Sequence, residues 1–130
     1  MIVLDTHIWV WWVHNDPKLP RPYAALIQAN ESSGIGISVF SCWEVAKLVQ
    51  LKRLTLHVDV ETWLQNALAY PGIVLLPMTP RIAVEANQLP GTFHKDPADE
   101  IIVATARDEN CALVTVDSRI LAYPHVQHAP

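Results

Sequence analysis

Apolar residues occur along the chain in two patterns that predict different secondary structures. Short, mostly apolar runs are typical of buried strands, whereas apolar residues that recur every three or four positions are typical of helices. The first pattern predicts strands over residues 2–5, 35–40, 73–78 and 112–117. The second predicts helices over residues 7–14, 23–34, 41–53, 59–72, 79–89 and 96–110, with a short helical turn over 117–123.

This order of elements predicts the α/β class, in which a parallel sheet is covered by helices on both faces. Prolines fall mainly between the elements, as in the breaker at residues 15–22, and no linker or internal repeat is visible. We therefore expect a single domain over residues 1–130. Residues 125–130 should form either a final edge strand or a loose tail.

The composition suits one packed core, because 51% of the 130 residues are hydrophobic. The opening MIVLDTHIWVWWV is too short to span a bilayer, and it lacks the basic start and the small-residue cleavage site of a signal peptide. We expect a cytoplasmic protein with no membrane segment. Cys42 and Cys111 lack the close spacing of a zinc site, so reduced, buried thiols are expected.

The net charge of −4 argues against a protein that holds nucleic acid by a broad positive field. Any contact with nucleic acid must therefore be local. Basic residues lie on or near the segments that carry the acids discussed below: Lys47, Lys52, Arg53, Lys95, Arg107 and Arg119. Scattered cations of this kind are more often a solvated surface, so they are weak support for such a contact.

Four acids stand where predicted strands end or where predicted helices begin: Asp5, Glu44, Asp99 and Asp117. In an open parallel sheet these positions share one edge, where ligands bind, so we expect the four to converge. Helix capping is the structural alternative. In this alternative, Asp5 and Asp117 each cap a helix, and Ser41 and Glu44 form a capping box. Asp96 caps the helix that begins at Pro97, and Asp99 lies in its first turn.

Convergence would have an electrostatic consequence. Two carboxylates about 4 Å apart repel by roughly 4 kcal/mol at an effective dielectric of about 20. Such a site must therefore hold protons, with raised pKa values, or divalent cations. Oxygen ligands without a nearby cysteine suit Mg²⁺ or Mn²⁺ better than zinc, so we predict one or two of these ions.

The ordered set of motifs resembles a PIN domain, and more closely a VapC-type toxin. The residues that carry the resemblance are Asp5-Thr6 after the first strand, Ser41-x-x-Glu44 on a helix, HKDPADEIIVATA at 94–106 and TVDSRI at 115–120. The resemblance covers essentially the whole chain. It implies a three-layer α/β/α sandwich with a central, mostly parallel sheet.

The resemblance also implies a function: a metal-dependent endoribonuclease of a type II toxin–antitoxin pair, neutralised by a small cognate antitoxin and usually dimeric. The catalytic, metal-binding quartet would be Asp5, Glu44, Asp99 and Asp117. Supporting residues would be Thr6, Asp96 and Thr115. We expect hydrolysis of RNA phosphodiester bonds, in which one cation activates a water and a second, if present, steadies the leaving oxygen.

Residues beside the quartet are candidates for RNA contacts. Lys47 lies one turn after Glu44, and His94 and Lys95 precede the DPAD motif, although a lone loop histidine is more often structural. The chain departs from the family at Glu100, a position often basic in close relatives, and at Ile120, where an aromatic residue is frequent. A negative charge at Glu100 would weaken the attraction of the RNA backbone near the site or alter an antitoxin contact.

The aromatic residues are interpreted as packing or interface rather than as RNA platforms. The WVWW cluster at residues 9–12 could stack on unpaired bases, but apolar side chains this dense are more often core or a protein interface, and we favour an interface. Trp43 and Trp63 are expected to pack internally.

Two other functions fit parts of the sequence. A receiver-like signalling domain also binds Mg²⁺ at the carboxyl edge of a small α/β sheet, but the runs at 35–40 and 73–78 end without the acids it needs. A non-catalytic interaction module would use its carboxylates only as helix caps. Tight Mn²⁺ binding that is lost in Asp5→Asn would be inconsistent with such a module, and phosphate transfer from a small phosphodonor would support the receiver.

Overall fold

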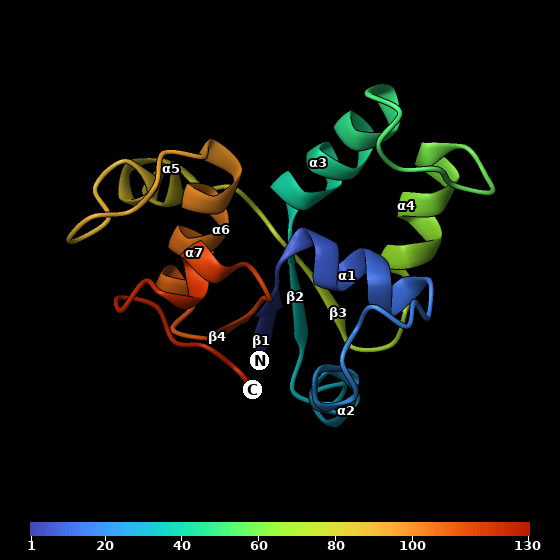
Figure 1. Cartoon of the computed structure of the whole chain (residues 1–130), viewed down its shortest axis with the longest axis horizontal. Coiled ribbons are helices and arrows are strands. Elements are labelled where there is room, and N and C mark those ends of the chain that lie inside the picture. Colours follow the sequence, from blue (N-terminus) through green and yellow to red (C-terminus); the bar gives the residue numbers. More distant parts are fainter.

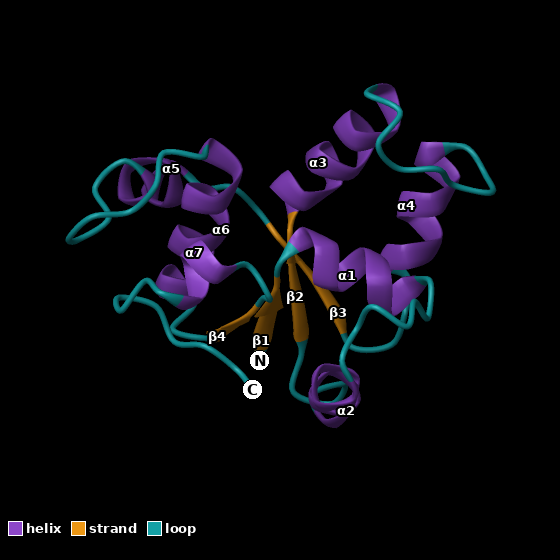
Figure 2. Ribbon diagram, viewed as in Figure 1, coloured by secondary structure: helices purple, strands orange, loops and turns teal.

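The computed structural model describes residues 1–130 as a four-stranded, all-parallel sheet with helices on both faces (Figures 1 and 2). The strands lie in the order β3-β2-β1-β4. Their bounds are β1 Ile2–Leu4, β2 Ile35–Ser38, β3 Ile73–Leu76 and β4 Ala112–Val114. In the register of the sheet, Ile2 of β1 lies opposite Ile35 of β2 on one side and Ala112 of β4 on the other.

Seven helices connect and cover the strands. They are α1 Thr6–Val13, α2 Arg21–Ala29, α3 Val39–Gln50, α4 Val60–Leu68, α5 Pro80–Ala86, α6 Pro97–Asp108 and α7 Ser118–Leu121. The predicted elements are thus all present, with ends that differ by a few residues. None of the helices combines the length and the apolar composition that a membrane crossing requires.

Alternate residues of the strands build two separate cores. Ile2 and Leu4 of β1 belong to a core that includes Trp9 of α1 and Trp63 of α4, whose rings meet edge to face with centroids 5.2 Å apart. Val3 points to the opposite face of the sheet, where it joins the buried side chains of α6 and α7. The expected three-layer α/β/α arrangement is therefore confirmed.

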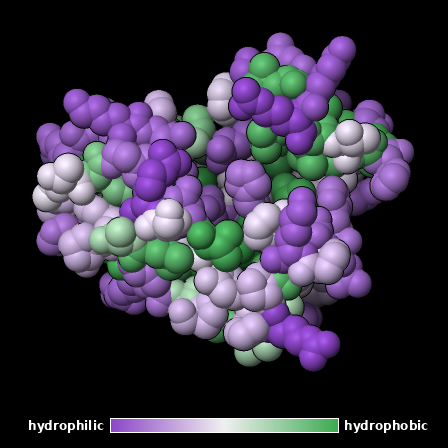
Figure 3. Space-filling model, in the orientation of Figure 1, coloured by the Kyte–Doolittle hydropathy of each residue, from purple (hydrophilic) through white to green (hydrophobic).

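Strand β3 differs from the prediction, because it is an edge strand rather than a buried one. It pairs only with β2, and Val74 and Leu75 are 41% and 47% exposed. The interpretation of Trp43 as internal packing was also wrong. Trp43 is 54% exposed, and its ring stacks on that of Phe40. In the space-filling view, hydrophobic residues gather over the outer part of α3 and towards α4 (Figure 3).

The structure also settles the burial of the other tryptophans and of the cysteines, and the conformation of the tail. Trp63 is buried as expected, and Trp9 is completely buried, so it cannot form part of an interface. The two thiols are free but only partly buried. The tail forms a single parallel bridge from His128 to Leu113 of β4, in which the Leu113 N–H donates to the carbonyl of Gln127 at 2.8 Å.

Gly72, which leads into β3, occupies a position that no side chain can share. Its φ is +84°, and an added Cβ would lie 2.4 Å from the carbonyl oxygen of Glu31. We predict that Gly72→Ala lowers the free energy of unfolding by roughly 3 kcal/mol, because a left-handed conformation and a backbone clash add together.

Gly91→Ala is the matched control for this prediction. Gly91 also has a positive φ, of +67°, but the nearest atom to an added Cβ is the His125 ring at 3.3 Å. Gly91→Ala should lower the free energy of unfolding by only about 1 kcal/mol. Urea unfolding measures both variants, and equal losses would contradict the clash at Gly72.

Candidate active site

The strand order creates a switch point at the carboxyl end of β1. From β1 the chain proceeds to β2 and β3 on one side, whereas β4 lies on the other side. Ligands of open α/β sheets bind in the crevice that such a reversal leaves. Asp5 follows β1 and Asp117 follows β4 by three residues, so two of the four predicted acids stand at the switch point.

The carboxylate of Asp5, just after β1, is held by hydrogen bonds, one of them from Thr115, just after the neighbouring strand β4. Its carboxylate accepts the Thr115 hydroxyl at 2.7 Å through one oxygen and the N–H of Thr6 at 2.8 Å through the other. Asp5 therefore also caps α1, as the structural alternative proposed. Only 7% of the residue is exposed, so the two donors replace much of the solvent that the charged form would need.

Glu44 reaches the same place from α3, but not as part of a capping box. The cap of α3 is Ser38, whose hydroxyl accepts the N–H of Phe40, so Ser41 and Glu44 lie inside the helix. The capping-box interpretation is therefore wrong. Thr6 joins α1 to this helix: its hydroxyl oxygen lies 2.5 Å from Glu44 Oε1, to which it donates, and 2.8 Å from Ser41 Oγ.

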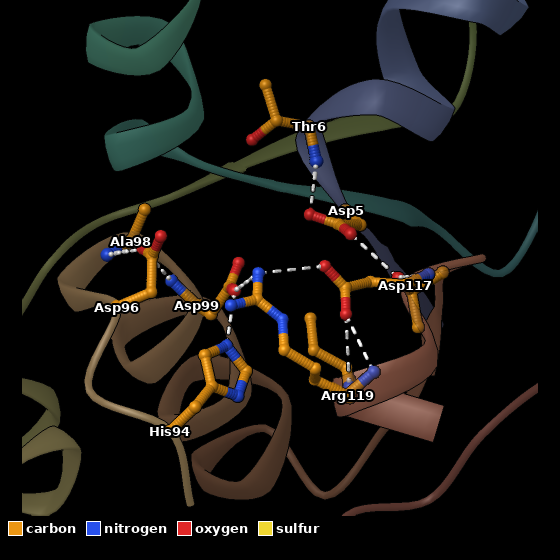
Figure 4. Close-up of polar contacts among 10 residues, drawn as sticks. Asp5, Thr6, His94, Asp96, Ala98, Asp99, Asp117 and Arg119 are labelled. Atoms are coloured by element: carbon orange, nitrogen blue, oxygen red, sulfur yellow. Dashed lines mark hydrogen bonds and ion pairs between the residues drawn. The ribbon is translucent and has the colours of Figure 1, made fainter. Parts of the chain in front are cut away.

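The two aspartates of the DPAD motif have separate tasks. Asp96 caps α6, since its Oδ1 accepts the N–H groups of Ala98 and Asp99 at 3.0 and 3.3 Å. The carboxylate of Asp99 makes no capping bond. Its Oδ2 lies instead 2.6 Å from Nε2 of His94, within a loop that approaches the helix from below in Figure 4.

Arg119 lies between two of the acids, and sequence reasoning did not include it in the site. Its guanidinium Nη2 is 3.4 Å from Asp117 Oδ2 and 3.7 Å from Asp99 Oδ2 (Figure 4). Asp117 also caps α7 by accepting the N–H of Arg119 at 2.8 Å. A basic residue two positions after a helix-capping acid was the available signal, but its pairing with α6 depends on the tertiary fold.

A pocket of about 280 Å³ brings these residues together. Five acids line it: Asp5, Glu44, Asp96, Asp99 and Asp117. The remaining wall is formed by His7, Trp11, Val116 and Arg119. The acids come from four segments of the chain that meet at one edge of the sheet, with Asp96 and Asp99 both at the start of α6.

The predicted RNA-contact residues are not all at this pocket. His94 touches it through Asp99, as described above. The ammonium of Lys47 donates to Gln50 at 2.8 Å and lies 6.0 Å from the ring centroid of Trp43, so it points along the exposed side of α3. Lys95 is exposed in the loop before α6 and lines no part of the pocket.

Burial opposes ionisation of the clustered acids. Desolvation raises the pKa of Glu44 to about 7, and the nearby charges of Asp5 and Asp99 add to the effect. Desolvation also raises the pKa of Asp5 and of Asp99. Desolvation acts on Asp117 as well, but hydrogen bonds from Arg119 outweigh it, so the pKa of Asp117 lies below its ordinary value.

The donor set fits a hard divalent cation by its chemistry. In the arrangement described, no three His, Cys, Asp or Glu side chains surround a common point closely enough to hold an ion, because each carboxylate is turned towards a donor of the protein. All the acids nevertheless line one pocket and offer only oxygen, which Mg²⁺ and Mn²⁺ prefer. To bind such an ion, the carboxylate side chains would have to rotate away from these donors.

Comparison with known proteins identifies relatives over nearly the whole chain. Residues 2–126 match the model of the PIN domain family. Ribonuclease VapC22 of Mycobacterium tuberculosis (strain ATCC 25618 / H37Rv) is 32% identical over 124 residues, which cover 95% of this chain and 92% of that protein.

Solved structures share the fold at lower identity. A chain of FitAcB from Neisseria gonorrhoeae is 21% identical with a TM-score of 0.70, and covers 100% of this chain and 97% of its own length. A chain of VapBC2 from Rickettsia felis, bound to a DNA fragment from its promoter, is 19% identical with a TM-score of 0.68 and coverages of 98% and 97%. These similarities confirm the PIN-like architecture.

The raised pKa of Glu44 predicts a pH-dependent stability for the protein in a chelator. Its pKa rises from 4.5 to about 7 on folding, so the stabilisation is complete below pH 4.5 and is lost as the pH rises through about 7. We expect a loss on the order of 2 kcal/mol between pH 4.5 and 8, measured by urea unfolding in EDTA. Asp5 and Asp99 contribute with the same sign.

Comparison with Glu44→Gln isolates this contribution from other titrating groups. That variant should lose distinctly less stability over the same pH range, whereas Glu61→Gln, at the exposed start of α4, should follow the unsubstituted protein. Parallel curves for Glu44→Gln and the unsubstituted protein would contradict the assignment.

Proposed function

The chain belongs to the PIN domain family, and we propose that it is a metal-dependent endoribonuclease that acts as the toxin of a toxin–antitoxin pair. The observation that carries the proposal is the meeting of Asp5, Glu44, Asp99 and Asp117 in one pocket at the switch point of the sheet. A relative of nearly equal length, 32% identical, is a ribonuclease by name, which supports RNA as the substrate.

The four acids are the residues that would hold Mg²⁺ or Mn²⁺. Asp5, Glu44 and Asp99 would share one ion, and Asp117 would bind a second or orient the attacking water by a hydrogen bond. Such ions, when bound, lower the pKa of a water and stabilise charge on the leaving oxygen. The chemistry is hydrolysis: a water oxygen bonds to phosphorus, and the bond from phosphorus to the leaving oxygen breaks.

The neighbours of the acids act as positioning residues. Thr115 holds one carboxylate oxygen of Asp5, and Thr6 holds Glu44, so two acids from distant segments keep a fixed orientation. His94 does the same for Asp99. The guanidinium of Arg119, at the rim of the pocket with 58% of its side chain exposed, is suited to a charge-assisted contact with a phosphate.

A cognate antitoxin and a second copy of the chain are the proposed protein partners. The structures with this fold include VapBC2, FitAcB and a toxin–antitoxin complex from Klebsiella pneumoniae, the last 21% identical with a TM-score of 0.65, which supports an antitoxin partner. Exposed apolar side chains on β3 and α5, among them Leu75 and Val84, offer a surface for a homodimer. We place the protein in the cytoplasm.

Two structural observations disfavour the alternative functions. The strand order β3-β2-β1-β4 differs from the order 2-1-3-4-5 of receiver domains. A module whose acids only cap helices would need Glu44 to be a capping residue, and Glu44 lies inside α3 instead. The ribonuclease is therefore the function that the site supports best.

Asp99→Asn should lower RNA cleavage by roughly 100-fold or more, because it removes a charge from the site and leaves the cap at Asp96 intact. Asp59→Asn is the matched control: the same chemical change at the exposed cap of α4, outside the pocket. New RNA 5′ ends, mapped after brief induction in a bacterial host, measure cleavage. Equal cleavage by Asp99→Asn and the unsubstituted protein would refute the assigned role.

Removal of divalent cations should abolish cleavage, and Mg²⁺ or Mn²⁺ should restore it, because without a cation nothing in the pocket lowers the pKa of the attacking water. Calorimetric titration of the unsubstituted protein with Mn²⁺ should show binding that Asp5→Asn loses at least tenfold. Cleavage that persists in EDTA would show that the reaction does not depend on the metal.

A further inference from the structure

A second groove adjoins the acidic pocket along one side of α1. Its volume is about 480 Å³, within the range of about 300 to 1,000 Å³ that ligand pockets occupy. Its wall includes α1, the turn after it, and the loop that follows α3. The residues that matter below are His7, Trp11, His14, Asp16, Lys18 and Arg53.

The groove and the pocket form one continuous surface. His7 and Trp11 line both cavities. Thr6, on the wall of the groove, is the residue whose hydroxyl binds Glu44 in the pocket. A polymer whose scissile bond lies among the acids therefore has an open path into this groove.

Positive charge in the groove is not neutralised by ion pairs. Lys18 and Arg53 are exposed and take part in none of the ion pairs of the chain, which engage Arg81, His94, Arg107 and Arg119 instead. The one acid of the wall, Asp16, accepts the backbone N–H of Lys18 at 2.9 Å. On a chain of net charge −4, such a pair of free cations is a local attraction for a polyanion.

Two aromatic features of the wall suit a nucleotide. The half-buried ring of Trp11 stands beside His7, with centroids 6.1 Å apart, and an indole face of this kind stacks on bases of any sequence. Nε2 of His14 accepts the indole N–H of Trp63 at 2.8 Å, which leaves its Nδ1 as a hydrogen-bond donor.

We propose that this groove binds the single-stranded RNA that flanks the scissile phosphate, with Lys18 and Arg53 on backbone phosphates and Trp11 under a base. The inference rests on the proposed ribonuclease function and names the part of the chain that holds its substrate. An acidic peptide would satisfy the two cations, but RNA also accounts for the ring of Trp11 and for the continuity with the acidic pocket.

Binding of a fluorescein-labelled twelve-residue oligouridine tests the proposal by anisotropy, with Asp99→Asn present in every protein so that the RNA stays intact. Adding Lys18→Gln and Arg53→Gln should weaken binding at least tenfold. It should also reduce the slope of log K against log salt by about 1.4, since each phosphate contact on a single strand contributes about 0.7. Trp11→Leu should weaken binding roughly fivefold or more without changing that slope.

Arg21→Gln with Arg81→Gln is the control, because it removes the same charge from sites outside the groove. The affinity of this control variant for the oligouridine should stay within twofold of that of the protein with Asp99→Asn alone. Affinity and salt slope unchanged by the Lys18 and Arg53 substitutions would overturn the proposal, as would equal losses in the control, which would indicate net charge alone.

Three further outcomes show whether this proposal fails alone or together with the function on which it rests. If the protein with native Asp99 cleaves RNA while the groove variants bind and cleave normally, only the groove assignment fails. If the groove variants lose inhibition by the cognate antitoxin but keep RNA affinity, the groove is a protein surface and the proposal is wrong. If the protein neither binds the oligouridine nor cleaves RNA, both the proposed ribonuclease function and the groove assignment fail.

Discussion

Mutual repulsion among the carboxylates in one small pocket is offset by donors that the fold brings from elsewhere in the chain. The Thr115 hydroxyl reaches Asp5 from the neighbouring strand, the Thr6 hydroxyl reaches Glu44 from α1, and a histidine and an arginine approach Asp99. Thr115, Thr6 and Arg119 lie far along the chain from these acids, whereas His94 precedes Asp99 by only five residues. The site therefore exists only when the sheet and three helices have assembled, and the strand order decides which segments meet.

Helix capping and acidic clustering are compatible in this structure rather than alternatives. Asp5 and Asp117 cap α1 and α7, and Asp99 lies in the first turn of α6, where the helix dipole favours negative charge. Helices that follow parallel strands begin at the same edge of the sheet, so caps at these positions are brought together by the topology. Local helix stabilisation and the shared site thus use the same carboxylates.

The sequence was sufficient for features that depend on local patterns or on strand order. Apolar periodicity located every strand and helix, and the positions of the acids relative to those elements predicted their meeting. Features that are set by tertiary contacts could not be predicted from the sequence. Ser38 rather than Ser41 caps α3 because β2 stops two residues earlier than its apolar run, and the exposure of Leu75 depends on β3 lying at the edge. The approach of Arg119 to Asp99 likewise requires α6 and α7 to pack together.

The bridge between the tail and β4 makes the two edges of the sheet unequal. Leu113 exchanges hydrogen bonds with Gln127 and Ala129, so the outer backbone groups of β4 are partly occupied within the chain. β3 has no such cover, and its exposed side chains are apolar. Unpaired edges are templates for strand addition, so any growth of this sheet by a further strand is directed to β3. Proteolytic trimming after residue 126 would remove this protection and create a second edge open to aggregation.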